Sequence, residues 1–271
     1  MPEGDTLHRT AAGLRPHLVG RAVMGARSHT PGPAVERIVG ATITAVDAVG
    51  KNLLVRFDNG LELRTHLRLH GSWHRYRPGE RWRRPPGRAR LVLETSDAIA
   101  VCFDCPTVEL FEQRAEHLHP SLGRLGPDLV APGFEVAEAL RRLRDPSRAY
   151  LTIAEALLDQ RALAGIGNVY KSEILWIERV SPFAPVGSVE EAVLARLVAT
   201  ARRLLTLNAD RRRSPERVTT DGRPAAAGEP LWVYGRRDRP CRRCGTPIRS
   251  IQQGSDLPRT TYWCPRCQEG T

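Results

Sequence analysis

Six cysteines carry the clearest chemical pattern in this chain of 271 residues. Four of them near the C-terminus follow the spacing C-x2-C-x19-C-x2-C, and these are Cys241, Cys244, Cys264 and Cys267. Two CxxC knuckles of this kind bring four thiolates into one tetrahedral zinc site. Disulfides are the alternative, but they are disfavoured in an intracellular setting. The spacing therefore predicts one structural Zn²⁺.

The other two cysteines, Cys102 and Cys105, lie in the segment AIAVCFDCPTV, which reads as a strand running into a turn. No second CxxC pair lies nearby to complete a metal site. Cysteine without such partners behaves as a small apolar side chain. We expect both to be buried structural thiols.

Lysine is rare among the basic residues. Of 41 lysines and arginines only Lys51 and Lys171 are lysine, which leaves 39 arginines. A GC-rich genome produces such a bias, and a position that keeps lysine can need a proton transfer that arginine cannot perform. A plain solvated charge is the alternative at either position.

A glycine turn between two apolar helical segments spans Leu157 to Trp176 (LLDQRALAGIGNVYKSEILW). Gly165 and Gly167 permit a tight turn, and Asn168 is expected to cap the second helix. The N–H groups at the start of a helix suit a phosphate. Turns of this kind also connect ordinary helices, so the pattern alone does not establish a phosphate site.

The charge balance indicates a polyanionic partner. The formal net charge is +11, with a sequence pI near 10.1, and nucleic acid is the commonest polyanion that binds such proteins. A membrane surface is the rival partner, but no stretch approaches the ~18 apolar residues of a spanning helix. The N-terminus, MPEGDTLHRT, has no apolar segment typical of a secretory signal. We expect a cytosolic protein.

The first half of the chain is predicted to be mainly β after one helix. Behind Asp5, the expected N-cap, four apolar residues recur at helical spacing up to Leu18, although Pro16 should kink or end that helix. Alternating apolar runs predict strands at residues 41–49, 51–57, 61–67, 89–95 and 98–103. Asn59-Gly60 predicts a hairpin between the second and third strands. Such short strands indicate a sandwich or a barrel.

The second half reads as helical. Residues 119–133 are rich in Pro and Gly and are expected to form a linker, and an apolar helical stripe covers residues 193–205. Residues 208–230 read as a loop. We predict an N-terminal domain at 1–120, a linker at 121–134, a helical domain at 135–230 and a zinc finger at 231–271.

Four motifs in order give a resemblance that covers essentially the whole chain. MPEGDT at the start, Gly50-Lys51, the GIGN turn and RTTYWCPRCQ at the end together resemble the Fpg/Nei family of DNA glycosylases. PEG after the initiator Met makes the chain look more like endonuclease VIII, in its actinobacterial branch. The resemblance implies an α+β multidomain fold. Its parts are an N-terminal β-sandwich with an N-terminal helix, a helical domain with a helix–two-turn–helix (H2TH) motif, and a zinc-ribbon hairpin.

The resemblance also implies catalytic residues. Loss of Met1 would expose Pro2, whose secondary amine would attack the sugar C1′, and an α-amino group is partly unprotonated at neutral pH. Glu3 resembles the family's general acid, and Lys51 matches its hairpin lysine, which contacts the phosphate beside the lesion. A proline merely tolerated at position 2 and a solvated Glu3 are the alternatives.

Further residues match the family's DNA contacts. Leu69, flanked by Arg68 and His70, falls where endonuclease VIII fills the hole left by the flipped nucleotide. A core position for Leu69 within a strand is the alternative. Asn168 matches the phosphate-clamping asparagine of the H2TH motif, and Arg259 the arginine at the tip of the zinc hairpin.

The sequence thus predicts a monomeric bacterial DNA glycosylase and abasic-site lyase of base excision repair. It would remove oxidised bases, pyrimidines in preference, and nick the strand by β/δ-elimination. Its partner would be damaged double- or single-stranded DNA in the cytoplasm, associated with the nucleoid, and not a membrane. The alternatives are an enzyme that is mainly an abasic-site lyase, a non-catalytic zinc-ribbon DNA-binding protein, or a zinc-ribbon protein that binds RNA.

Overall fold

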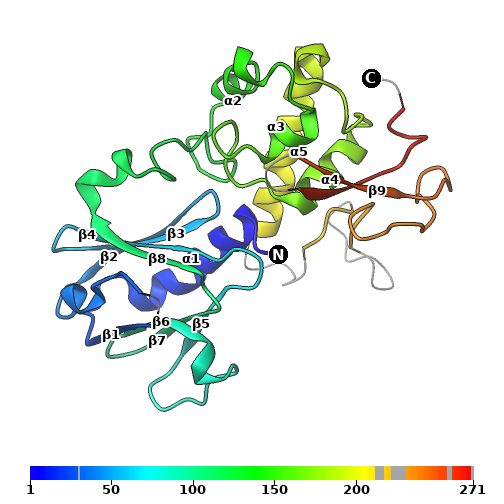
Figure 1. Ribbon diagram of the computed structural model, residues 1–271. Coiled ribbons are helices and arrows are strands. Elements are labelled where there is room, and N and C mark those ends of the chain that lie inside the picture. Colours follow the sequence, from blue (N-terminus) through cyan, green and yellow to red (C-terminus); the bar gives the residue numbers. More distant parts are fainter. Residues whose placement is uncertain (30, 211–216, 221–229, 255–257, 270–271) are drawn as a thin grey trace. The chain divides into compact units, whose positions relative to one another are not determined.

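The chain forms two compact units, Met1–Arg124 and Leu125–Thr271, each around its own hydrophobic core (Figure 1). The structure is a computed structural model that describes residues 1–271 except 30, 211–216, 221–229, 255–257 and 270–271. The loop predicted at 208–230 therefore lies largely outside the described residues. Within the described ranges, no helix combines the length and the apolar character needed to cross a bilayer.

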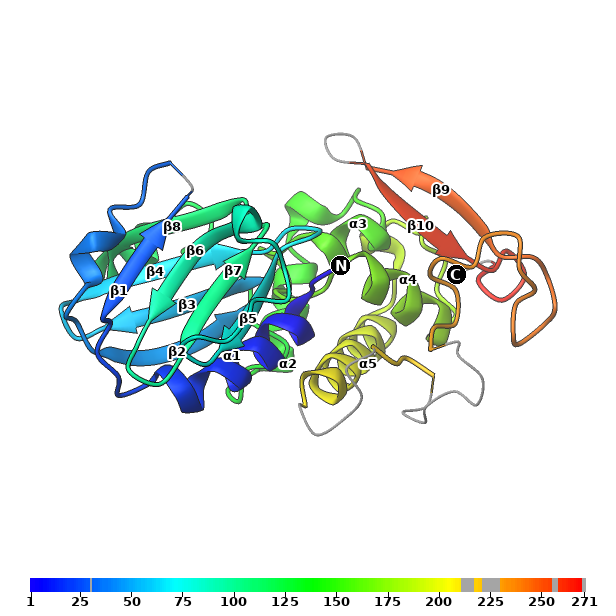
Figure 2. The same ribbon diagram turned by 90° about the horizontal axis from the view of Figure 1, so that it is seen from below.

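The first unit is a sandwich of two four-stranded antiparallel sheets, with orders β1-β6-β7-β5 and β2-β3-β4-β8 (Figure 2). The strands are β1 (Gly25–Ser28), β2 (Ile43–Val49), β3 (Asn52–Phe57), β4 (Leu61–His66), β5 (Ser72–Tyr76), β6 (Ala89–Glu94), β7 (Ile99–Phe103) and β8 (Thr107–Glu112). Three short 3₁₀ turns accompany them: η1 (Val35–Ile38), η2 (Pro86–Arg88) and η3 (Gln113–Leu118). The predicted sandwich is confirmed.

All five predicted strands are present, and three strands escaped prediction. β1 and β5 carry GARS and SWHRY, which contain few aliphatic residues, and β8 carries TVELFE, whose polar/apolar alternation covers only Thr107–Leu110. These strands are stabilised by pairing with β6, β7 and β4 rather than by a strong pattern of their own.

The N-terminal helix α1 (Gly4–Leu18) packs along β2. Its apolar face is the predicted one, with Leu7 and Leu18 fully buried. Two details of the prediction are wrong. The N-cap is Glu3 rather than Asp5, and Pro16 lies inside the last turn without ending the helix. Proline has a helical φ and removes only one N–H, so the final turn tolerates it.

Among its described residues, the second unit contains four α-helices and a two-stranded hairpin. They are α2 (Val136–Leu143), α3 (Ile153–Leu158), α4 (Asn168–Ile177), α5 (Glu191–Ala209), β9 (Arg249–Gln253) and β10 (Arg259–Trp263), with 3₁₀ turns η4 (Pro146–Arg148) and η5 (Val186–Ser188). The predicted stripe at 193–205 forms the buried face of α5. Leu129 and Phe134, from the segment read as a linker, pack into this unit's core.

Candidate active site and nucleic-acid interface

Glu3 places a carboxyl group at the N-terminus of α1. Glu3 is fully buried as the N-cap, and its N–H donates to Thr6 Oγ1 at 3.5 Å. Pro2 is half-buried just outside the helix, and Met1 is exposed. An amine at residue 2 and the Glu3 carboxyl would thus be adjacent in the chain and held by one helix end.

Lys51 occupies a two-residue turn between β2 and β3. Val49 pairs with Asn52, and Gly50 has φ 58°, which glycine adopts without strain. The buried Asn52 braces this turn, because its Nδ2 donates to Val49 O at 3.0 Å while its Oδ1 accepts from Arg64 Nε at 2.9 Å. Arg64 pairs in turn with Glu109 on β8. The turn that presents Lys51 is therefore fixed by a chain of hydrogen bonds across the sheet.

Three cations surround His66 at the end of β4. Burial and the charges of Arg68, Arg64 and Lys51 lower the pKa of His66 to about 4. A lowered pKa means that the imidazole is neutral above that pH, so it carries no charge at pH 7. Its Nδ1 accepts from the Arg68 backbone N–H at 3.1 Å. The structure thus brings Lys51 and Arg68, two predicted site residues, into one electropositive region that suits a phosphate.

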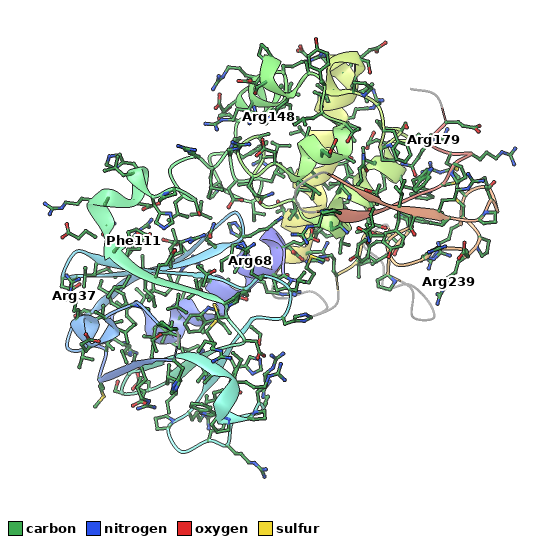
Figure 3. All side chains as sticks on the ribbon, in the orientation of Figure 1. Arg37, Arg68, Phe111, Arg148, Arg179 and Arg239 are labelled. Atoms are coloured by element: carbon green, nitrogen blue, oxygen red, sulfur yellow. The ribbon has the colours of Figure 1, made fainter. Side chains whose placement is uncertain are left out.

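The loop after β4 presents an apolar side chain to solvent. Leu69 is 46% exposed and Arg68 and His70 are exposed on either side of it, whereas Leu67 is buried in the core. The alternative that Leu69 lies in the core is therefore wrong. Gly71 closes the loop by donating to Leu67 O at 2.9 Å, and a Cβ there would lie 2.5 Å from that oxygen. Arg68, which Figure 3 labels, has a left-handed backbone with φ 49°. Insertion of Leu69 into DNA remains a prediction.

A hollow of about 630 Å³ flanks this loop within the first unit. Arg68, Leu69 and His70 line one part of it, and Arg88 and Arg90 line another. Asp104, which pairs with Arg88 at 2.7 Å, also lines the hollow. Arginines still outnumber this one carboxylate in the lining, so the surface suits a polyanion.

Asn168 is held against the zinc hairpin. Its Nδ2 donates to Thr260 O at 2.8 Å, and its buried Oδ1 has no hydrogen-bond partner among the described residues. The expectation that it caps α4 is wrong, because Gly167 is the N-cap and Asn168 is the first helical residue. This contact brings Asn168 to the end of β10 at which Arg259 lies, exposed. A phosphate role for either side chain remains a prediction.

Lys171 is the more unexpected of the two lysines. It is 1% exposed, and its Nζ donates to Thr261 Oγ1 at 2.8 Å. Thr261 donates onward to Gln253 Oε1 at 2.8 Å, and Gln253 Nε2 donates to Thr152 Oγ1 at 2.8 Å. This network joins α4, both strands of the hairpin and the start of α3. The rarity of lysine was the only signal in the sequence that marked it.

Glu173, unlike Lys171, is a buried residue that sequence reasoning missed. Its carboxylate accepts backbone N–H bonds at 2.8 Å from each of Trp232, Val233 and Tyr234, and accepts the Thr219 hydroxyl. Hydrogen bonds to a charged group contribute about 1.5–3 kcal/mol each. Glu173 therefore fastens to α4 the segment that leads into the first zinc knuckle.

The four C-terminal cysteines form a compact thiol cluster. Their Sγ atoms all lie within 4.8 Å of one another, with 3.9 Å between Cys241 and Cys267 and 3.4 Å between Cys244 and Cys264. Four sulfurs bound tetrahedrally at 2.3 Å from Zn²⁺ would lie about 3.8 Å apart. The Cys267 N–H also donates to Cys264 Sγ at 3.4 Å, a contact that would stabilise a metal-bound sulfur. The arrangement fits one structural Zn²⁺.

Cys102 and Cys105 are free and buried, as predicted. Burial raises the pKa of the Cys102 thiol well above its ordinary value. Cys105 Sγ donates to Thr107 O at 3.1 Å. Both act as packing residues of the sandwich.

Replacing Arg259 with Ala tests the exposed end of the hairpin. We expect weaker binding to duplexes of any sequence and a salt slope smaller by about one, because one phosphate contact is lost. Zinc content should not change, since Arg259 contacts none of the cysteines. Titrations of a labelled duplex over a salt series measure this, with Arg203→Ala, an exposed arginine on α5, as the control. Unchanged affinity and slope would remove Arg259 from the interface.

Three family models match consecutive parts of the chain. Residues 1–107 match the N-terminal domain of formamidopyrimidine-DNA glycosylase, and residues 125–215 match its H2TH domain. Residues 239–270 match a zinc finger found in FPG and IleRS. Sandwich, helical domain and four-cysteine hairpin together define a protein with the Fpg-like fold.

Relatives extend this match over the full length. The chain is 44% identical to a probable endonuclease 8 2 of Streptomyces coelicolor, over 100% of this chain and 95% of that one. It is 39% identical to the DNA-(apurinic or apyrimidinic site) lyase Nei2 of Mycolicibacterium smegmatis, over 99% of both chains. The chain belongs to the Fpg/Nei family, as the sequence motifs predicted.

The fold is also that of solved structures. A Lactococcus lactis formamidopyrimidine-DNA glycosylase, non-covalently bound to DNA containing an abasic site, superposes with a TM-score of 0.79 at 22% identity. The match covers 99% of this chain and 100% of that one.

Proposed function

We propose that this protein is a bifunctional DNA glycosylase and abasic-site lyase of base excision repair that acts on oxidised bases, with pyrimidines preferred. The observation that carries the proposal is a half-buried Pro2 followed by a buried Glu3 at the N-terminus of α1. The full-length match to relatives named as endonuclease 8 and as an abasic-site lyase supports it.

The proposed chemistry begins once Met1 is removed. The Pro2 nitrogen is then a free secondary amine, whose lone pair is available for attack in its unprotonated form. Its lone pair attacks C1′ of the damaged nucleotide, the base leaves with the glycosidic electron pair, and an iminium ion forms. The iminium acidifies the C2′ proton, and its removal expels the 3′ phosphate by β-elimination. A second elimination releases the 5′ phosphate.

Glu3 is the proposed proton donor in this scheme. A carboxyl adjacent to the nucleophile can protonate the sugar oxygen as the ring opens. Lys51 would hold the phosphate beside the lesion, together with the cationic region around His66. Because Asn52 and Arg64 fix its turn, Lys51 would reach that phosphate with little loss of conformational freedom.

The remaining proposed roles concern DNA shape. The exposed Leu69 would fill the space left by the flipped nucleotide, with Arg68 and His70 against the unpaired base. Asn168 and Arg259 would hold phosphates and keep the duplex bent. The four cysteines would bind Zn²⁺ and so fold the hairpin that carries Arg259.

A panel of oligonucleotides with a single lesion tests the proposal. We expect base release and strand nicking at an oxidised pyrimidine, nicking at an abasic site, and slower reaction at 8-oxoguanine. Lys51→Ala should lower base release and still nick the abasic strand. A denaturing gel separates the β- and δ-elimination products. Nicking at abasic sites alone would favour an enzyme that is mainly a lyase, the alternative suggested by the relative named as a lyase.

We propose further that the protein acts as a monomer on double- or single-stranded DNA in the bacterial cytoplasm, at the nucleoid. Structural neighbours bound to damaged or abasic DNA support the nucleic-acid partner. Duplex binding without base release or nicking would favour the non-catalytic alternative.

A further inference from the structure

Three arginines line a hollow at the cysteine end of the zinc hairpin. The hollow has a volume of about 370 Å³ and is lined by Arg179, Arg243, Arg266, Cys244 and Cys267. Arg179 follows α4, whereas Arg243 and Arg266 each lie inside one CxxC knuckle. All three are exposed. None of them has a part in the proposed reaction.

The three guanidinium groups differ in how they are held. Arg243 is fixed, because Nη1 donates to Trp176 O at 3.3 Å and the guanidinium lies 4.0 Å from the centre of the Trp176 ring. The side chains of Arg179 and Arg266 have no hydrogen bond or ion pair with any described residue. The hollow therefore combines one preorganised cation with two whose hydrogen-bond donors are available to a ligand.

Arg179, labelled in Figure 3, directly follows the last residues of α4. Its φ is 59°, directly after the C-cap Glu178 of α4, where most helices place glycine. The backbone at the helix end accounts for this conformation, because the Arg179 N–H donates to Trp176 O at 3.3 Å and the Val180 N–H donates to Leu175 O at 2.9 Å. This helix end leaves the Arg179 side chain at the surface, where it forms no polar contact with the described residues.

The charge of the metal centre does not account for all three arginines. Four thiolates and one Zn²⁺ sum to −2, whereas the three guanidinium groups sum to +3. A net positive charge of about one therefore remains at the hollow. The carboxylates of Asp and Glu can bind a planar guanidinium group through two parallel hydrogen bonds.

The position of the hollow separates it from the proposed DNA contacts. α4 has ten residues, with Asn168 at its start and Arg179 beyond its end, and a helix of that length spans about 15 Å. β10 likewise has Arg259 at one end and the cysteine knuckle at the other. A phosphate bound at a helix N-terminus lies beyond that end of the axis. A duplex held there would leave the opposite end uncovered.

We propose that Arg179, Arg243 and Arg266 form a docking site for an acidic peptide segment, rich in Asp or Glu, of a partner protein. The segment binds while the duplex is held at the other end of α4 and β10. The proposal rests on the proposed function only for the position of the duplex. It gives the repair protein a means of being recruited without competition from its substrate.

The test uses the full-length zinc-loaded protein and a fluorescein-labelled peptide of about eight aspartates at low salt, where charge pairing is least screened. We expect binding that is equally tight with and without a saturating duplex containing an abasic analogue. The double variant Arg179→Gly and Arg266→Gln should bind the peptide at least about tenfold more weakly. Arg179→Gly restores the residue favoured at this φ, so the fold should be retained. Arg203→Gln is the matched control and should bind as the parent does.

Four results would overturn the proposal. They are absence of peptide binding to the parent protein, equal binding by the double variant, displacement of the peptide by the duplex, and loss of zinc from the double variant. Tighter binding of a short single-stranded oligonucleotide to the same arginines would make the hollow a second nucleic-acid site instead. Strand cleavage by the same preparations is measured in parallel. Loss of cleavage with intact peptide binding would refute the proposed function alone.

Discussion

Borohydride added to the protein and a duplex with one abasic site should give a stable covalent protein–DNA adduct. Attack of an amine on the sugar aldehyde expels water and forms an iminium ion, which hydride reduces to an amine. Mass mapping of the peptides should place the adduct on a terminal Pro2, with Met1 absent. A Schiff base on a lysine would give the same band on a gel. Only the peptide mass mapping therefore identifies the residue that formed the adduct.

The decisive comparison is with a protein that retains residues in front of Pro2. The Pro2 nitrogen is then an amide without a basic lone pair, and trapping should fall below detection while duplex binding remains. Lys51→Ala should still trap, because its amine is not the nucleophile in this scheme. An adduct on Lys51, or equal trapping by the extended protein, would refute the Pro2 mechanism. No adduct with intact binding would favour a non-catalytic protein.

Local patterns predicted the parts of this fold in which one residue type dominates. The alternating runs predicted β2, β3 and β4 because these strands bury apolar side chains. The cysteine spacing predicted the thiol cluster because four thiolates surround one metal ion. The strands β5 and β8 were missed because β5 has no aliphatic residue and the alternation in β8 is only four residues long, so both depend on pairing with neighbouring strands. Pairing across the chain is not visible in a local pattern.

Residues of the candidate site could be predicted only where they belong to a motif of the family. Pro2, Glu3 and Lys51 came from family motifs. The contacts of Lys171 with Thr261 and of Asn168 with Thr260 join residues about ninety positions apart in the sequence. Buried polar groups of this kind need partners that only the tertiary structure supplies. The N-caps at Glu3 and Gly167 were misassigned for a related reason, since a cap depends on where the chain enters the helix.

The second large effect is expected from Cys264→Ser. Cys264 is fully buried among the zinc knuckles together with Trp176, Val233 and Ile248. A serine hydroxyl is a poor zinc ligand, and three thiolates leave the tetrahedron open. Zinc content should fall from one per chain to near zero. The short hairpin has little core of its own, so it should lose its fold with the metal.

Loss of zinc in Cys264→Ser should also weaken DNA binding, while the first unit stays folded. Without the hairpin, Asn168 and Lys171 lose Thr260 and Thr261, and Arg259 loses its fixed position, so duplex affinity should fall at least about tenfold. The sandwich has a separate core and should keep its own thermal transition. Cys105→Ser is the matched control, because Cys105 is a buried thiol outside the cluster whose hydrogen bond to Thr107 O a serine can also make. Retention of zinc and full affinity in Cys264→Ser would contradict a four-thiolate centre, whereas loss of zinc with unchanged affinity would show that the hairpin does not contact DNA.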